Sequence, residues 1–190
     1  MALKQTLAMG APQIAGGAFA AAPIGSTLPT DAKTVLDEAF KARGYLDEDG
    51  FKLSIDRSSN DRKAWGGVTV RRLTSEYAEK ISLTLLESAN ADVLKMVFGE
   101  KNVEATSDKV TVKHTSADPE PMVFAFTTKD GDSLRRVVVP NGQLSLAGEV
   151  QYTHSDLITY PVEIAANVDG KGVTVYEYIE EGTTPASDAS

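Results

Sequence analysis

The chain has 190 residues, with 19 basic and 27 acidic side chains and a formal net charge of −8. This length predicts one domain with a core large enough to fold alone, and the absence of cysteine excludes disulfides, thiolate metal sites and cysteine nucleophiles. The acidic pI near 4.8 argues against binding of nucleic acid through phosphate neutralisation. No apolar stretch approaches the roughly 18 residues of a membrane span.

The first 30 residues contain eight alanines and four glycines and almost no charge. Such a composition has little side chain to bury, so we expect an extended N-terminal arm over residues 1–30 that either orders against a partner or stays a flexible terminus. Residues 19–22 resemble a signal-peptidase site, but no continuous apolar stretch precedes them. We therefore expect no secretory signal.

Two short helices are predicted. Near residues 31–43, Thr30 or Asp31 can cap a segment whose apolar residues recur at helical spacing. Near residues 91–98, Asn90 can cap a second such segment. Both helices are expected to pack one face on a sheet.

Most of the remaining sequence alternates apolar and polar residues, as half-buried strands do. The clearest strands are residues 80–85, 109–113 and 173–178. Turn dipeptides lie between such runs, at Asp130-Gly131, Asn141-Gly142 and Asp169-Gly170. The pattern predicts a mainly β fold, an antiparallel β-sandwich or barrel with one or two short α-helices. We expect a single domain over residues 31–180 and a flexible C-terminal tail over 181–190.

Residue types that support catalysis or metal binding are present without suitable spacing. His154, Ser155 and Asp156 are neighbours along the chain, and neighbours on a strand point to opposite faces and cannot form a catalytic relay. Residues 45–50 resemble part of a calcium-binding loop, but Tyr45 occupies the first ligand position. We therefore expect no catalytic, cofactor-binding or metal-binding residues.

Several sequence blocks in a fixed order resemble one known family. The blocks read GYLDEDG at 44–50, SIDRS at 54–58, KAWGG at 63–67 and TLLESANADVLK at 84–95. They resemble the major tail tube proteins of long-tailed siphophages, most closely those of phages that infect actinobacteria. The resemblance is specific over about residues 29–100 and weaker over 101–180.

The resemblance implies a structural virion protein of the phage tail, made in the host cytoplasm, and not an enzyme. Its subunits would close into rings, usually hexameric, that stack into a tube through which DNA passes during ejection without specific binding. Implied partners are other copies of the chain and the tape measure, terminator and distal tail proteins, with no membrane and no cofactor. Two other classes stay open, a monomeric β-sandwich module that decorates a capsid or binds carbohydrate, and an enzyme on an all-β scaffold.

One set of candidate residues concerns contacts between subunits. Aromatic and arginine side chains often carry the binding energy of interfaces, and Trp65 is either such an anchor or a core residue. The expected subunit contacts are Tyr45, Arg57, Arg62, Lys63, Trp65, Gly66 and Gly67.

A second set concerns the lumen of the implied tube. Residues 108–190 contain six basic and 13 acidic side chains, and a negative wall would repel phosphates and let DNA slide. We expect several of these acidic residues to face the lumen, the alternative being an outer surface that keeps the protein soluble. The candidates are Glu149, Asp156, Glu163, Asp169 and Glu177.

Overall fold

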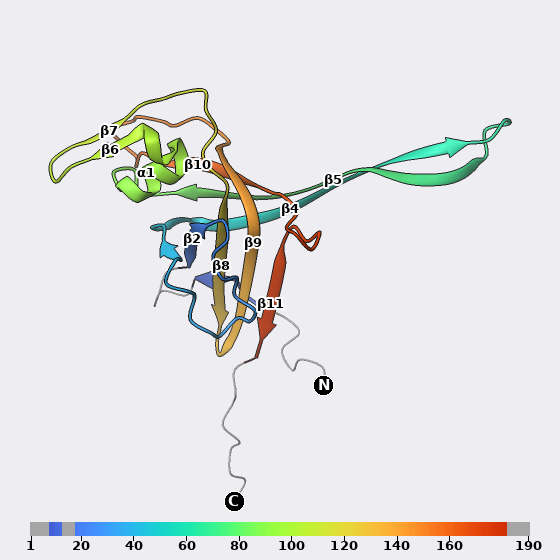
Figure 1. Cartoon of the computed structure of the whole chain (residues 1–190), viewed down its shortest axis with the longest axis horizontal. Coiled ribbons are helices and arrows are strands. Elements are labelled where there is room, and N and C mark those ends of the chain that lie inside the picture. The colour runs from blue at the N-terminus through green and yellow to red at the C-terminus, as the bar shows by residue number, and fades with distance from the viewer. Residues whose placement is uncertain (1–7, 13–17, 182–190) are drawn as a thin grey trace, which may run out of the picture.

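The computed structural model describes residues 8–12 and 18–181 (Figure 1). Within them lie one α-helix, α1 (Ala91–Phe98), and one short 3-10 helix, η1 (Glu100–Asn102). The strands are β1 (Ala11–Pro12), β2 (Phe19–Pro23), β3 (Lys41–Ala42), β4 (Leu46–Lys63), β5 (Thr69–Leu85), β6 (Val103–Ala105), β7 (Val110–Val112), β8 (Met122–Asp130), β9 (Ser133–Leu146), β10 (Tyr160–Ala166) and β11 (Tyr176–Glu180). No helix in this part of the chain is long and apolar enough to cross a membrane.

Nine strands form one antiparallel sheet in the order β3-β2-β8-β9-β10-β5-β4, with β1 paired to β8 and β11 to β9. The long strand β9 links the two parts of this sheet, because its first half pairs with β11 and its second half with β10. β6 and β7 form a separate two-stranded sheet. The predicted mainly β, antiparallel architecture is confirmed, and it is sandwich-like rather than a closed barrel.

The larger core forms where the sheet curls over on itself. The ring of Phe126 on β8 stacks on Phe19 of the adjacent β2, at 4.9 Å between centroids, and on Phe51 of β4, at 4.5 Å. Since β4 and β8 are far apart in the strand order, the contact with Phe51 shows that β4 crosses over β8. Apolar residues of β5, β10 and α1 complete this core.

A smaller core lies on the opposite face of β2, β8 and β9. Strand alternation sends Ala20, Ala22 and Ala125 to this side, where the segment before β3 covers them with Phe40. The alanines of β2 are fully or almost fully buried, so residues 19–23 belong to the sheet and not to an extended arm. Of the predicted arm and tail, residues 1–7, 13–17 and 182–190 lie outside the described residues.

The predicted helix near residues 31–43 is not formed. Asp31 does bond to the backbone, since its Oδ1 accepts the N–H of Thr34 at 2.6 Å, but no helix follows. Nη1 of Arg136 donates to the carbonyl oxygens of Asp31, at 2.9 Å, and Thr34, at 2.8 Å. A helix would need these carbonyls for its own amides. The segment instead follows bends that bury Ala32 and Phe40, so a tertiary contact overrides local helix propensity.

The second predicted helix and some of the predicted turns are present. Helix α1 begins after Asn90, whose side chain accepts the N–H of Asp92, and ends at Gly99, whose φ is 92°. The predicted turn at Asp130-Gly131 is present one residue later, since Asp130 pairs with Ser133 at the end of β8 and Gly131 and Asp132 form the turn to β9. Asn141 and Gly142 lie within β9 and not in a turn. A side chain at position 142 would come within 2.6 Å of the Phe124 ring, so this glycine permits close packing.

Candidate assembly interface

The distal parts of β4 and β5 form a hairpin that leaves the body of the molecule. Every residue from 52 to 78 is exposed, and we call this segment the hairpin arm. Figure 1 shows it projecting away from α1 and from the rest of the sheet. The pairing runs from Lys52 opposite Ser82 to Lys63 opposite Thr69, so the arm is about 40 Å long at roughly 3.3 Å per residue.

The hairpin arm carries large apolar side chains that are exposed in the free subunit. The exposed large apolar residues of the arm are Leu53, Ile55, Trp65, Val68, Val70, Leu73 and Tyr77. A two-stranded hairpin without a core is only marginally stable in water, and exposed apolar surface on a protruding strand pair marks an interaction site. The arm is therefore suited to packing against another molecule.

The tip of the arm is a tight turn built on two glycines. The N–H of Gly67 donates to the carbonyl of Ala64 at 3.0 Å, and Gly66 and Gly67 have φ values of 100° and 87°, which other residues rarely adopt. This turn presents Trp65 with its side chain fully exposed. In the free subunit Trp65 is therefore not a core residue.

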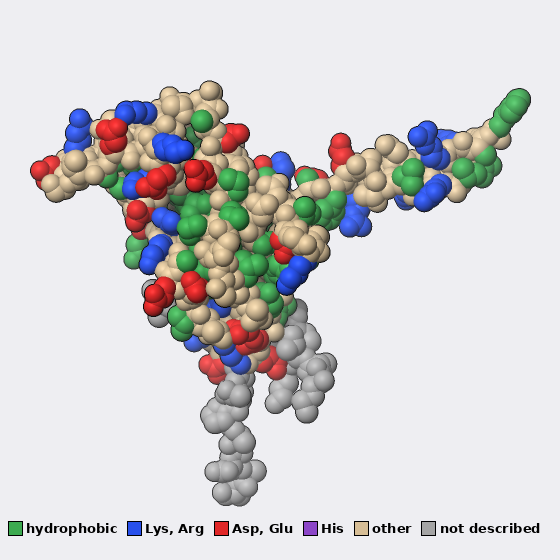
Figure 2. All heavy atoms as spheres, viewed as in Figure 1, with side chains coloured by type: hydrophobic (Ala, Val, Ile, Leu, Met, Phe, Trp, Pro, Cys, Tyr) green, Lys and Arg blue, Asp and Glu red, His purple; other side chains and the backbone are tan. Residues whose placement is uncertain are grey.

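The arm differs in charge from the rest of the protein. It contains six basic and three acidic side chains, a net +3, whereas the remaining residues contain 13 basic and 24 acidic side chains, a net −11. Figure 2 shows the basic side chains spread along the visible face of the arm. Such opposite charges favour contact between the arm of one copy and the body of another.

Two arginines near the tip are placed unfavourably for an isolated subunit. Arg62 and Arg71 lie directly opposite each other on β4 and β5, and like charges in this position destabilise a hairpin. Neither guanidinium has an ion-pair partner among the described residues. The neighbouring Arg72 does pair with Asp61 at 2.9 Å, and this contact lowers the pKa of Asp61. The pair Arg62 and Arg71 is therefore available to carboxylates of a partner.

The predicted contact residues do not all lie together. Arg57, Arg62, Lys63, Trp65, Gly66 and Gly67 lie on the arm, where the guanidinium of Arg57 packs 5.3 Å from the ring centroid of Tyr77. Tyr45 is exposed but lies outside the arm, before β4 begins, where its carbonyl accepts the N–H of Leu86 at 3.1 Å. The length of the arm was not predicted from the sequence. The apolar and polar residues of the arm alternate in the same way as those of a strand packed within a sheet.

The predicted lumen acids are also scattered. Glu149 and Asp156 lie in the exposed loop between β9 and β10. Glu163 pairs with Lys80 at 3.0 Å and Glu177 with Arg135 at 3.1 Å. Asp169 closes a turn, where its carboxylate accepts the Tyr176 hydroxyl at 2.7 Å and two backbone N–H groups. These bonds lower the pKa of Asp169 and raise the pKa of Tyr176 to about 12.

Four neighbouring strands do share one polar face. In the pairing register, Lys52, Ser82, Glu163 and Ser145 form one row across β4, β5, β10 and β9. A second row contains Ser54, Lys80, Ala165 and Gln143. We call these two rows the polar face. The intervening residues, such as Ile81 and Leu144, point into the core. The polar face is on the opposite side of these strands, and its side chains are polar or small and partly or fully exposed.

The described residues hold no group of three or more His, Cys, Asp or Glu side chains that could bind a metal ion. Glu79 is largely buried on β5, where it accepts hydrogen bonds from the hydroxyls of Tyr77 and Thr174. Tyr77 is on the arm and Thr174 precedes β11, so this carboxylate links the base of the arm to the body.

The comparisons with known proteins agree with surfaces that are suited to assembly. A search of curated proteins finds no match. Comparison with protein families matches residues 13–190, nearly the whole chain, to the family described as phage tail tube protein. This family comprises structural components of the virion. With its antiparallel sheet and exposed hairpin arm, the chain belongs to the phage tail tube protein family.

Proposed function

We propose that copies of this chain close into hexameric rings and that the rings stack into the tube through which phage DNA leaves the capsid. The observation that carries this proposal is the hairpin arm, a long strand pair that has no packing partner within its own subunit. A contact between the arm of one copy and the body of the next is head-to-tail, and head-to-tail contacts generate closed rings or continuing filaments. Ring size is inferred from the family resemblance of the sequence blocks.

The polar face is the surface that best suits the channel. Ser54, Ser82 and Ser145 offer hydroxyls, and the positive charge of Lys80 is compensated by Glu163. A wall of this kind binds no phosphate tightly, whereas unpaired basic residues would hold DNA through counterion release. Of the five acidic candidates, Glu163 is the one that this orientation turns toward the channel. The net −11 of the molecule outside the arm repels the duplex at longer range.

Further partners follow from the same proposal. The ends of a tube need proteins that start and stop it, so the tape measure, distal tail and terminator proteins are the expected partners besides other copies. The subunit is expected to be made in the host cytoplasm and to enter the virion on assembly. The family assignment favours this role over a capsid decoration or carbohydrate-binding module.

Electron microscopy of the purified full-length chain at high concentration tests the proposal. We expect hollow tubes with a regular axial repeat, and an image reconstruction with six subunits per ring and Glu163 at the inner wall. A compact 20 kDa species at every concentration would contradict tube formation. Tubes whose inner wall consists of the arginines of the arm would contradict the assignment of the polar face.

A further inference from the structure

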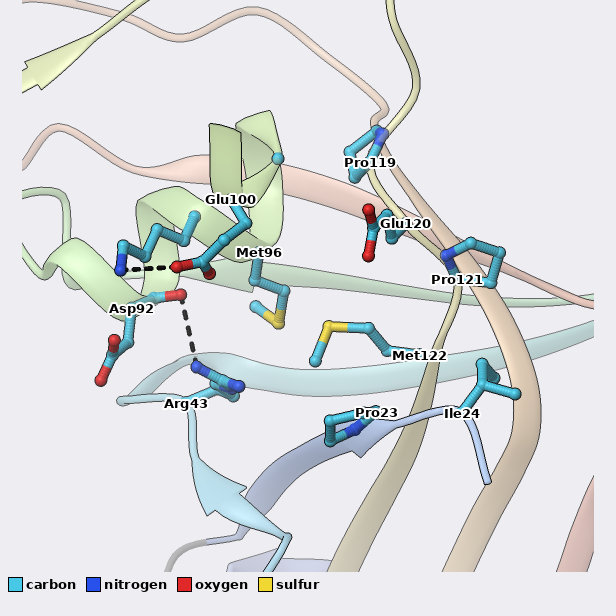
Figure 3. Close-up of a pocket in the computed structure, with 12 residues that line it drawn as sticks. Pro23, Ile24, Arg43, Asp92, Met96, Glu100, Pro119, Glu120, Pro121 and Met122 are labelled. Atoms are coloured by element: carbon cyan, nitrogen blue, oxygen red, sulfur yellow. Dashed lines mark hydrogen bonds and ion pairs between the residues drawn. The ribbon is translucent and has the colours of Figure 1, made fainter. Parts of the chain in front are cut away.

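A pocket beside α1 takes no part in the contacts described above. It has a volume of about 560 Å³ and lies between α1, the start of β8 and the residues that follow β2 (Figure 3). We call it the α1 pocket. Its lining includes Ile24, Arg43, Met96, Glu120, Pro121 and Met122. Such a volume is within the range of about 300–1,000 Å³ in which proteins bury small ligands.

The chemistry of the α1 pocket suits an aromatic ring. In Figure 3 the side chains of Met96 and Met122 point toward each other across it, and thioether sulfurs make favourable contacts with ring edges. The guanidinium of Arg43 borders the same space. Its Nη1 reaches only the carbonyl of Asp92, at 3.5 Å, and its buried Nε has no hydrogen-bond partner among the described residues. An arginine that is so weakly engaged is free to stack on an aromatic face.

The same chain supplies a side chain that fits this description. Trp65 is the only tryptophan in the sequence and lies fully exposed at the tip of the hairpin arm. The adjacent Gly66 and Gly67 carry no side chains, so the turn is narrow enough to approach a recessed site. An indole ring has a large apolar area to bury and gains from contact with sulfur and guanidinium groups.

The occupant of the pocket must come from another copy. In Figure 1 the arm leaves the body on the side opposite α1, so Trp65 cannot reach the pocket of its own subunit. Charge also favours a second copy. Arg62 and Arg71 lie unpaired just behind the tip, while the exposed carboxylate of Glu120 stands at the pocket, 4.0 Å from its nearest cation.

We propose that Trp65 of one copy inserts into the α1 pocket of the next copy, with Arg62 and Arg71 directed at the carboxylates around Glu120. This inference rests on the proposed function, because it needs copies that assemble, and it specifies which surface receives the arm. Repeated around a ring or along a tube, the contact relieves the repulsion between the two arginines and covers the exposed indole.

Tryptophan fluorescence of the wild-type chain tests the burial of the indole directly, since Trp65 is its single tryptophan. We expect the emission of dilute subunits to be that of a solvent-exposed indole and to shift to shorter wavelength as tubes form. Tubes whose emission keeps the solvent-exposed maximum would overturn the inference while leaving the proposed function intact. A chain that stays monomeric with unchanged emission would overturn both.

Cross-linking identifies the surface that receives the tip. With a photoreactive benzophenone amino acid in place of Trp65, illumination of tubes should link this position to peptides that contain Met96 or Met122 of another copy. The same amino acid in place of Val35, which is exposed but does not line the pocket, should not. Links from position 65 to any other peptide, including the N-terminal segment of a neighbour, would overturn the pocket assignment.

A matched pair of substitutions completes the test. Ile24 and Val35 are both exposed aliphatic residues, but only Ile24 lines the pocket. Ile24→Glu should raise the concentration needed for assembly by tenfold or more, because hot-spot contacts typically carry at least this much, whereas Val35→Glu should change it less than about threefold. Equal effects of the two substitutions would contradict the proposal.

Discussion

The strands β4 and β5 run through both the hairpin arm and the body, yet their apolar side chains are exposed in one region and packed on the core in the other. On β5, the residues Ile81, Leu83 and Leu85 are buried and alternate with polar neighbours, as expected for a strand with one face on a core. On the N-terminal side of Glu79, the same strand is exposed on both faces. The pairing with β4 continues across this boundary, so the arm is held together by backbone hydrogen bonds and by surface side-chain contacts such as Arg72 with Asp61 and Arg57 with Tyr77.

This difference has a consequence for stability. The body is stabilised by apolar burial, which contributes roughly 25 cal/mol per Å², whereas the arm has no such contribution until a partner covers it. Disruption of the body should therefore unfold the subunit, and disruption of the arm should spare the subunit and affect assembly. The following predictions test this separation.

The largest effect is expected when the arm is removed. Arg57 and Tyr77 lie directly opposite each other, so a two-residue Asn-Gly turn can replace residues 58–76 and close the shortened hairpin. We expect a monomer whose melting temperature changes by no more than a few degrees and which forms no tubes by electron microscopy. Tubes of normal length from this variant would show that the arm is not an assembly element.

A large effect is also expected from the core of the body. Phe126 is completely buried, so Phe126→Ala should lower the free energy of unfolding by about 3–5 kcal/mol in chemical denaturation followed by circular dichroism. On the arm, Leu73 is 39% exposed, and Leu73→Ala should cost less than about 1 kcal/mol. Similar losses for the two variants would mean that the arm packs on its own subunit in solution.

An intermediate effect is expected from two adjacent arginines. Arg136 is buried, which lowers its pKa, and it donates to the carbonyls of Asp31 and Thr34 and to the hydroxyl of Thr127. Arg136→Ala leaves these acceptors unpaired and should cost about 2–3 kcal/mol of unfolding free energy.

The control is Arg135→Ala, because Arg135 is exposed and forms only a surface ion pair with Glu177. Its loss should cost less than about 1 kcal/mol. Equal unfolding free energies of the two variants would mean that Arg136 does not stabilise the bends over residues 31–40.

The smallest effect is expected from pH. The hydrogen bond from Tyr176 raises its pKa to about 12 and lowers the pKa of Asp169. The tyrosine therefore stabilises the fold fully below its ordinary pKa near 10, and this contribution is lost as the pH rises toward 12. The carboxylate stabilises the fold above its ordinary pKa, and this contribution is lost as the pH falls through the lowered value.

The check is an NMR titration of Tyr176 with Asp169→Asn as the comparison. The midpoint should be near pH 12 in the wild type and fall toward 10 in the variant, since the charged acceptor is gone. An unchanged midpoint would mean that the hydrogen bond does not form in solution.

Local sequence was sufficient to predict structure where the interactions are local. Helix α1 begins and ends where Asn90 and Gly99 predict, because capping involves residues within one turn of the helix. The turn near Asp130 and Gly131 and the antiparallel, mainly β architecture were predictable for the same reason, since alternation and turn chemistry repeat over a few residues. The family blocks in residues 44–67 overlap the β4 half of the arm, but they did not predict that this segment leaves the body.

Only the tertiary structure decided features that depend on residues far apart in the sequence. Residues 31–43 have the pattern of a helix, but Arg136, about a hundred positions later, takes the carbonyls that a helix would need. Residues 19–23 have the composition of a flexible segment, but they lie between β8 and β3 as a buried strand. The pairing of β4 with β5 was not predicted, because alternation identifies a strand but not its partner. Whether a core covers the paired strands is a long-range property, and the fold leaves residues 52–78 uncovered.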